Sequence, residues 1–511
     1  MNRLVAKNIT STSYGWKIMR RAFCSDVASN VSGTSSSDAI NDHGAKHEHE
    51  TAAPQFDIAI IGGGMVGMGL ACSLARMPLT KHLSVAIVDS NPALLNTTSI
   101  KKDDPPDPRV STVTPTTISL FKGVGAWKYI EQLRHAYFDK MQVWDYTGLG
   151  FTRYNARDVN KEVLGCVVEN KILHRSLLSC LQDTDLQKTI FSSRLDSMIS
   201  GPTSASKALN NIAASTEALH ERGNLTKLKL SDGNSLYAKL VVGADGSKSR
   251  VRELAGIKTT GWNYSQNAII CTVEHTVENR CAWQRFLPNG PLALLPIGDR
   301  YSNIVWTMDP KESLSRKTMN DDEFVRAVNH ALDGGYGPRP KPQVSGSGGI
   351  FSWLGADVAS SNKCFELPPK VVRLVTERMA FPLSLMHANS YASKRVVLIG
   401  DAAHTVHPLA GQGVNMGFAD AFALSKVISE GVAVGSDIGE VSLLKKYEAD
   451  RKTANIAMMA ILDGFQKAYS VDFGPLNFIR AAALYGANYI PPLKRNIISY
   501  ASGEHRLPIF T

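Results

Sequence analysis

The 511-residue sequence contains no CxxC pair, no acidic residue before Asp26 and no apolar run as long as a membrane-spanning helix. Seven scattered cysteines argue against a zinc site or a disulfide framework and suit reduced thiols in an intracellular compartment. Because about 18 uninterrupted apolar residues are needed to cross a bilayer, no transmembrane helix is expected. With 43% hydrophobic and 20% charged residues, the sequence indicates a soluble fold of at least two units.

The acid-free N-terminus carries much of the positive charge. Five basic residues precede Asp26 and account for half of the net charge of +10, so the remaining chain is only mildly basic and no nucleic-acid partner is expected. Residues 1–25 contain Ser and Thr and lack the continuous apolar stretch of a secretory signal, which is typical of a mitochondrial transit peptide. A disordered basic tail is the alternative interpretation. Residues 26–55 have little to bury and are expected to form a linker.

A glycine turn follows the first strong strand pattern. The apolar run at 56–61 leads directly into Gly62-x-Gly64-x-x-Gly67, and a helical pattern continues over 68–76. Gly62 permits a tight turn, Gly64 lets the backbone approach a pyrophosphate, and Gly67 allows the helix to pack closely on the strand. The free amides at the start of this helix favour an anion. This order of strand, turn and helix predicts a dinucleotide-binding unit.

Two further strand patterns also end in acids. The strand expected at 84–88 ends in Asp89, whose carboxylate is expected to accept hydrogen bonds from an adenosine ribose. The strand expected at 240–243 is followed by Asp245 and Gly246, a dipeptide that is often no more than a turn. The second pattern therefore indicates a cofactor site only in combination with the other motifs.

A third motif is the most specific. The strand pattern at 395–399 ends in Gly400 and Asp401, and a glycine-rich loop at 408–417 then opens a long helix. In this order, the three motifs resemble the aromatic-ring flavoprotein monooxygenases built like para-hydroxybenzoate hydroxylase, over about residues 56–451. This resemblance implies FAD as cofactor and no metal.

The resemblance also implies the architecture. We expect an α/β fold in which a Rossmann-like FAD-binding domain is assembled from discontinuous segments, with an interleaved antiparallel-sheet substrate domain and a C-terminal helical region. That region either lies on a membrane surface or packs back on the core. The expected FAD-binding segments are 56–108, 161–257 and 376–452, the substrate segments are 109–160 and 258–375 with an insertion near 345–376, and the helical region is 453–511.

Individual cofactor contacts follow from the same resemblance. Asp401 would hold the ribityl chain of FAD, the loop at 408–415 would lie along the isoalloxazine ring, and Asp245 would touch the pyrophosphate region. Many relatives have Glu in place of Asp89, which shortens the reach here but keeps the same hydrogen bond. The other positions expected to bind the cofactor are Arg109, Asn170, Gly400, Gly411, Gln412, Gly413 and Asn415.

Segments between the cofactor motifs narrow the resemblance. Residues 141–145, 262–268 and 282–296 look like the ubiquinone-biosynthesis hydroxylases, and the expected transit peptide points to the mitochondrial branch. This implies hydroxylation of a polyprenylated benzoate or phenol by dioxygen through a flavin hydroperoxide, at the matrix side of the inner mitochondrial membrane. The implied partners are ferredoxin and its reductase as electron donors, with NADPH as the alternative, and other ubiquinone-biosynthesis proteins in a membrane-associated complex.

The catalytic residues and the substrate stay open. His404 and Pro408 are weak candidates, and a structural role for His404 in shaping the flavin loop is favoured over a role as base. One alternative function is an FAD-dependent hydroxylase or epoxidase of another apolar substrate. Another is a non-catalytic flavoprotein component of a biosynthetic complex.

Overall fold

The computed structural model describes residues 53–95, 100–200, 225–298, 300–340 and 365–504. The expected transit peptide at 1–25, the linker up to residue 52 and residues 345–364 of the expected insertion lie outside this part of the chain. Within the described ranges, no helix is long and apolar enough to span a bilayer, and no cluster of His, Cys, Asp or Glu side chains forms a metal site. The five cysteines found there are buried and free.

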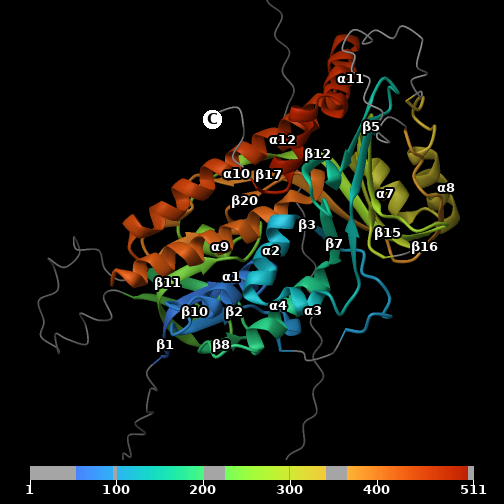
Figure 1. Ribbon diagram of the computed structural model, residues 1–511. Coiled ribbons are helices and arrows are strands. Elements are labelled where there is room, and N and C mark those ends of the chain that lie inside the picture. The colour runs from blue at the N-terminus through green and yellow to red at the C-terminus, as the bar shows by residue number, and fades with distance from the viewer. Residues whose placement is uncertain (1–52, 96–99, 201–224, 299, 341–364, 505–511) are drawn as a thin grey trace, which may run out of the picture. The chain divides into compact units, whose positions relative to one another are not determined.

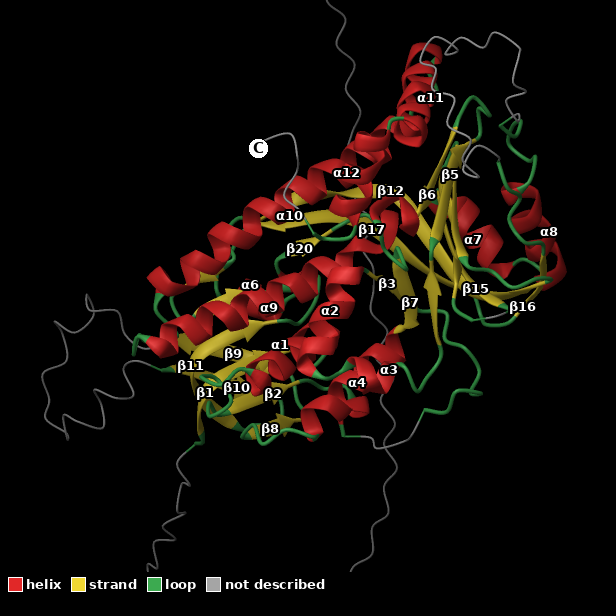
Figure 2. Cartoon of the chain, in the orientation of Figure 1, coloured by secondary structure: helices red, strands yellow, loops and turns green. Residues whose placement is uncertain are grey.

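Much of the expected FAD-binding region forms an eight-stranded sheet (Figures 1 and 2). Its strands are β1 (Gln55–Ile61), β2 (Val85–Val88), β8 (Lys188–Phe191), β9 (Leu195–Ser200), β10 (Thr226–Leu230), β11 (Ser235–Gly243), β18 (Ala392–Ser393) and β19 (Val396–Leu398). The order is β18-β19-β11-β1-β2-β8, with β10 and then β9 extending from β11. Strands β19, β11, β1, β2 and β8 run parallel, which explains the apolar, buried sequences of β2, β19 and the second half of β1.

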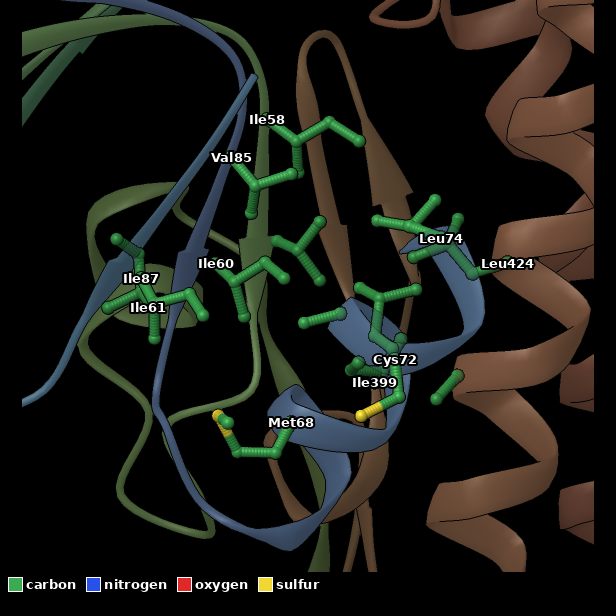
Figure 3. Close-up of a cluster of buried hydrophobic side chains, with 14 of the residues drawn as sticks. Ile58, Ile60, Ile61, Met68, Cys72, Leu74, Val85, Ile87, Ile399 and Leu424 are labelled. Atoms are coloured by element: carbon green, nitrogen blue, oxygen red, sulfur yellow. The ribbon is translucent and has the colours of Figure 1, made fainter. Parts of the chain in front are cut away.

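Helices pack against this sheet and complete its hydrophobic core. They are α1 (Met65–Arg76), α2 (Pro115–Val124), α3 (Trp127–Ile130), α4 (Asn170–Gln182), α6 (Arg250–Leu254) and α9 (Gln412–Ala433). Figure 3 shows Ile58 and Ile60 of β1 on the strand side of α1, and Leu74 of α1 beside Leu424 of α9. All four side chains are fully buried. The first and third sequence motifs therefore share one core.

The expected substrate domain forms a nine-stranded sheet with a separate core. Its strands are β5 (Lys140–Asp145), β6 (Phe151–Asn155), β12 (Thr259–His275), β13 (Cys281–Leu287), β14 (Gly290–Pro296), β15 (Tyr301–Met308), β16 (Val371–Leu374), β17 (Met379–Ala388) and β20 (His404–Thr405). Their pairing is antiparallel except between β5 and β13. Helices α7 (Pro310–Thr318) and α8 (Asp321–Leu332) pack on this sheet. Strand β12 is 17 residues long and pairs with both β15 and β17.

Two expected segments divide differently in the structure. Within 109–160, only β5 and β6 join the nine-stranded sheet, because β3 (Val110–Val113) and β4 (His135–Phe138) pair with β7 (Gly165–Glu169). Within 376–452, β17 belongs to the nine-stranded sheet because it pairs with β12. In both cases the partner strand is distant in sequence, so the local pattern does not reveal the pairing.

Three helices complete the chain: α10 (Val441–Ser470), α11 (Gly474–Tyr489) and α12 (Pro491–Ala501). They pack back on the core, since Thr152 Oγ1 donates to the carbonyl of Leu484 (2.5 Å) and Lys494 Nζ lies 2.9 Å from Asp158 Oδ2. They also present apolar surface. The large exposed side chains of this region include Phe465, Phe473, Phe478 and Ile479.

Candidate cofactor site

The parallel strands that precede the sequence motifs end in one row. Ile61 is in register with Val88 and with Gly243, and Gly243 is in register with Leu398. The turns that follow these four residues therefore leave the sheet side by side. Crevices at the carboxyl ends of parallel strands are the usual ligand sites of α/β sheets, so the pairing places the three motifs around one site.

The surroundings of the three glycines agree with the roles that the sequence predicts for them. Gly62 has φ +108°, and a Cβ there would lie 2.3 Å from the carbonyl oxygen of Ala244. A Cβ on Gly67 would lie 2.0 Å from the carbonyl oxygen of Gly62, so only glycine allows α1 to pack this closely. A Cβ on Gly64 would meet nothing within 4 Å. Gly64 thus presents open backbone at the N-terminus of α1, where amides favour a phosphate.

Asp89 supports the glycine turn from the next strand. Its Oδ2 accepts a hydrogen bond from the amide of Gly63 (2.7 Å), and its Oδ1 accepts one from the amide of Asn91 (2.8 Å). Each carboxylate oxygen can accept a second bond, so the ribose contact stays a prediction. On the other side of the turn, His174 Nε2 lies 2.7 Å from the carbonyl oxygen of Gly63. No sequence motif singled out this histidine.

Asp245 uses its carboxylate within its own segment. Oδ1 accepts from Ser249 Oγ (2.5 Å), while Oδ2 accepts from the amides of Arg250 (2.7 Å) and Val251 (3.1 Å) at the start of α6. The second motif contacts the glycine turn instead through the backbone of Ala244. The expected pyrophosphate contact by this segment stays a prediction.

The third motif packs directly on the first. Gly400, in the short helix η6 (Gly400–Ala402), has φ +59°, and a Cβ there would lie 3.2 Å from Val66 Cγ1. A Cβ on Gly417 would lie 2.7 Å from Val66 Cγ2 and 3.3 Å from Gly400 Cα. Asp401 follows with an exposed side chain. Although solvent reaches it, surrounding protein atoms partly desolvate the carboxyl and raise its pKa, an effect that the nearby His404 opposes.

Asn415 fixes the loop that opens α9. Its Oδ1 accepts from the amide of Thr114 (3.1 Å) and from Thr117 Oγ1 (2.8 Å), and its Nδ2 donates to the carbonyl of Thr112 (2.8 Å). Gly411 has φ +60° and also packs against Thr112. The side-chain amide of Asn415 is therefore occupied by hydrogen bonds within the protein. Cofactor contacts from this loop would come from its backbone.

The other predicted residues of this loop, Pro408, Gln412 and Gly413, lie near Gly411 and Asn415 in the chain. Pro408 precedes the short helix η7 (Leu409–Gly411), Gln412 Nε2 donates to the carbonyl of Ala501 (3.2 Å), and Gly413 lies in the first turn of α9. The predicted loop residues are thus continuous in space.

Arg109 and Asn170 are also brought together. The amide of Asn170 donates to the carbonyl of Arg109 (2.9 Å), and Asn170 Oδ1 accepts from Ser111 Oγ (2.7 Å). The Arg109 side chain is exposed and pairs with Asp107 (Nε to Oδ1, 3.4 Å). Asn303 Nδ2 of the nine-stranded sheet donates to the carbonyl of Pro108 (2.8 Å), so the segment that leads into β3 contacts that sheet.

His404 takes part in a buried network around Asp420. Its Nε2 lies 2.5 Å from Asp420 Oδ2, which also accepts from the amide of Gly400 (3.1 Å). Asp420 Oδ1 accepts from Arg451 Nε (2.9 Å) and Asn455 Nδ2 (3.0 Å). These contacts are shielded from solvent, since the side chains of His404 and Asp420 are both buried. The contacts favour a structural role for His404 over a role as base.

These features fit FAD. Open backbone at Gly64, the amides of α1 and the exposed side chain of Asp401 lie at the row of strand ends, and Arg109, whose side chain is also exposed, lies beside Asn170 at the start of α4. A dinucleotide needs amides for its pyrophosphate and acceptors for its sugar hydroxyls, and both are present. The motifs identified these residues in the sequence, whereas His174, Asn455 and the threonines around Asn415 carried no signal.

Comparisons with known proteins agree with this geometry. Residues 55–336 and 367–461 match the family model described as FAD binding domain. The chain is 33% identical to ubiquinone biosynthesis monooxygenase COQ6, mitochondrial, from Danio rerio, over 90% of this chain and 92% of that protein. It is also 33% identical to the Homo sapiens protein of the same name, over 88% of this chain and 92% of that protein.

Solved structures share the fold. The p-nitrophenol 4-monooxygenase PnpA from Pseudomonas putida aligns with a TM-score of 0.61 at 15% identity, over 89% of this chain and 99% of that chain. The probable FAD-dependent monooxygenase pqsL from Pseudomonas aeruginosa aligns with a TM-score of 0.58 at 18% identity, over 84% and 99%. The predicted fold class and the predicted FAD cofactor are confirmed.

Proposed function

Because the chain belongs to the FAD binding domain family, as one of the COQ6-type ubiquinone biosynthesis monooxygenases, we propose that it hydroxylates the aromatic ring of a polyprenylated benzoate or phenol. The enzyme is an FAD-dependent monooxygenase. The observation that carries the proposal is the register of β1, β11 and β19, which gathers three distant motifs at one edge of the sheet.

FAD supplies the oxygen chemistry when bound, and the protein positions it. Gly64 and the first amides of α1 would bind the pyrophosphate, and Asp401 would accept hydrogen bonds from the ribityl hydroxyls. The loop at 408–415 would lie along the ring, held in place by Asn415. Arg109 and Asn170 would complete the site from the adjoining ends of β3 and β7.

An apolar environment beside the flavin loop supports a prenylated substrate. Leu409 of this loop packs with Phe286 of β13 and with Leu462 and Tyr469 of α10. The rings of Phe286 and Tyr469 stack with centroids 3.7 Å apart. Such a surface would exclude water from the reacting ring and favour an apolar tail.

Electron supply and location form a second part of the proposal. Ferredoxin and its reductase would deliver the electrons at the matrix side of the inner mitochondrial membrane, within a complex of ubiquinone-biosynthesis proteins. The mitochondrial names of the relatives and the acid-free N-terminus support this location. The exposed apolar side chains of α10 and α11 support a peripheral membrane contact.

Mass spectrometry of quinone precursors tests the substrate. Cells that lack their own COQ6 gene should accumulate a prenylated, under-hydroxylated ring intermediate, and the wild-type chain should restore ubiquinone. Gly64→Val should restore less ubiquinone than the wild type, whereas Gly123→Val, at another exposed glycine whose Cβ would meet nothing within 4 Å, should restore it fully. Normal quinone levels with accumulation of a different apolar compound would favour another substrate. Rescue by an FAD-free variant would favour a non-catalytic component.

A further inference from the structure

A basic hollow lies at the start of α6. It is open to solvent, has a volume of about 600 Å³, and its lining includes three basic side chains, Lys248, Arg252 and Lys258. Glu253 is the acidic side chain of the lining, and it is paired with Arg250 (2.9 Å). Lys248 and Lys258 are exposed. With three basic side chains and one acidic side chain, the lining carries a net positive charge.

The positive charge continues onto α10. The amide of Asn389 donates to the carbonyl of Lys258 (2.8 Å), and Lys452 Nζ donates to the carbonyl of Asn389 (2.6 Å). Lys445 Nζ reaches Ser390 Oγ (3.1 Å) one residue further on. Glu448 pairs with Lys445 and Lys452 and balances part of this charge. We call the surface formed by Lys248, Arg250, Arg252, Lys258, Lys445 and Lys452 the basic surface.

The basic surface backs directly onto the cofactor segment. Arg252 Nη1 donates to the carbonyl of Ala402 (2.8 Å), the residue after Asp401. The amide of Ala388 donates to the carbonyl of Ala403 (2.8 Å), and Ala388 is paired with Thr259 at the rim of the hollow. A molecule bound here would be separated from the FAD-binding motif by a single segment of chain.

We propose that the basic surface docks the electron donor, an acidic iron–sulfur protein. This inference rests on the proposed function and names the face that the donor would use. Two reduced donor molecules would each lose one electron, and these two electrons with one proton from solvent would convert bound FAD into its reduced anion. Opposite charge on the donor would speed its encounter with this face and orient it.

An anionic membrane fits this surface less well. Membrane-binding surfaces combine basic with large apolar side chains, but Ile257 is the large apolar residue of the hollow. Three exposed phenylalanines, Phe465, Phe473 and Phe478, lie elsewhere, in and between α10 and α11. The position behind Ala402 also serves electron delivery and would have no use in membrane binding.

Charge reversal tests the proposal. The holoenzyme and its Lys248→Glu/Lys258→Glu variant are mixed with a reduced mitochondrial ferredoxin, kept reduced by its reductase, and loss of flavin absorbance is followed by stopped flow. The second-order rate constant should fall by about tenfold or more, since electrostatic steering changes association rates by about 10 to 1,000-fold. Added salt should slow the wild type and affect the variant little.

Matched controls isolate the surface. Lys311→Glu/Lys317→Glu, which reverses two exposed lysines of α7, should keep the wild-type rate. Both double variants should retain FAD and be reduced by dithionite as the wild type is. An unchanged rate in Lys248→Glu/Lys258→Glu overturns the docking face, and so does a loss confined to binding of cardiolipin-containing vesicles. A wild type that ferredoxin cannot reduce, but NADPH alone can, overturns the proposed donor itself.

Discussion

Asp420 shows how a buried charge can organise a cofactor segment without touching the cofactor. Burial by itself raises the pKa of this carboxyl, but His404, Arg451 and Asn455 together hold it below its ordinary value. The ionised carboxylate then holds the amide of Gly400 and the ring of His404 in fixed positions. Breaking such a buried pair usually costs about 3–5 kcal/mol, so this network is expected to be rigid.

Neighbouring glycines of the first motif should respond differently to substitution. Gly64→Val places its side chain in open space, so the fold should be kept while FAD affinity falls by about tenfold, through loss of hydrogen bonds from backbone that the side chain now covers. Gly67→Ala meets the carbonyl of Gly62 and should destabilise the fold by about 1–3 kcal/mol. FAD titration and urea unfolding measure the two effects. Equal loss of stability in both variants would contradict this division.

His407 should make stability depend on pH. Its ring is buried and finds no hydrogen-bond partner among the described residues, and burial lowers its pKa to about 4. The unfolded chain, with a His pKa of about 6.5, binds the proton first, so stability falls as pH drops below that value. Between about pH 7 and about pH 5 the loss should be about 2 kcal/mol from this residue.

His407→Leu removes that titration. The variant should therefore lose about 2 kcal/mol less stability than the wild type over the same pH range, as measured by urea unfolding at both pH values. His387, whose pKa burial also lowers to about 4, is present in both proteins and cancels in the comparison. Identical pH dependence in the two proteins would show that the His407 ring has the same pKa in the folded and the unfolded chain.

At the residue level, the sequence predicted those positions whose backbone geometry requires one residue type. Gly62 and Gly67 are examples, because a Cβ at either would collide with a carbonyl. It could not predict how side chains with several options are used. Asp245 accepts from the first amides of α6, a local use that its Asp-Gly motif did not indicate. His174 reaches the glycine turn from α4, because folding brings together residues that are far apart in the chain.

Strands were predictable where the sequence carries a strong local pattern. The sheet to which a strand belongs was less predictable, because pairing with a distant strand decides it. The apolar runs that became β1, β2 and β11 mark buried parallel strands by themselves. Strand β17 gives no comparable signal for its sheet, since only its partner β12 determines where it belongs. For the C-terminal helices, packing on the core is observed, because α11 buries Leu484 against β6. Contact with a membrane surface stays a prediction, which the exposed side chain of Ile479 supports.

The exposed face of α11 should bind lipid. Phe473, Phe478 and Ile479 are 59%, 46% and 61% exposed, and burying such side chains gains about 1.5–3 kcal/mol each. Changing all three to Ser should lower co-sedimentation with anionic vesicles by about tenfold or more and leave folding almost unchanged. Leu314→Ser/Val434→Ser removes comparably exposed side chains elsewhere and is the control. Equal binding by both variants would place lipid contact on another surface.

On the scale of the whole molecule, the FAD-binding sheet is assembled from strands that span residues 55–398, and the nine-stranded sheet is threaded between them. The discontinuous architecture was predictable because three motifs flank segments with strand patterns. The exact exchange of strands between sheets was not. It depends on contacts such as Asn303 to Pro108 and Ala388 to Ala403, which connect the nine-stranded sheet to the segments that follow β2 and β19 of the FAD-binding sheet.

These ties predict that the two sheets unfold together and that FAD stabilises both. A ligand that binds only the folded state adds about 2.7 kcal/mol at a concentration a hundredfold above its Kd, so removal of FAD should lower the unfolding midpoint. The buried Trp144, Trp283 and Trp306 all lie in the nine-stranded sheet and report on it by fluorescence in a Trp127→Phe background, which removes the buried tryptophan of the FAD-binding core. Their transition should shift with FAD concentration as far as the flavin signal does. If FAD moved the flavin transition and left the tryptophan transition in place, the two sheets would be independent folding units despite the contacts that join them.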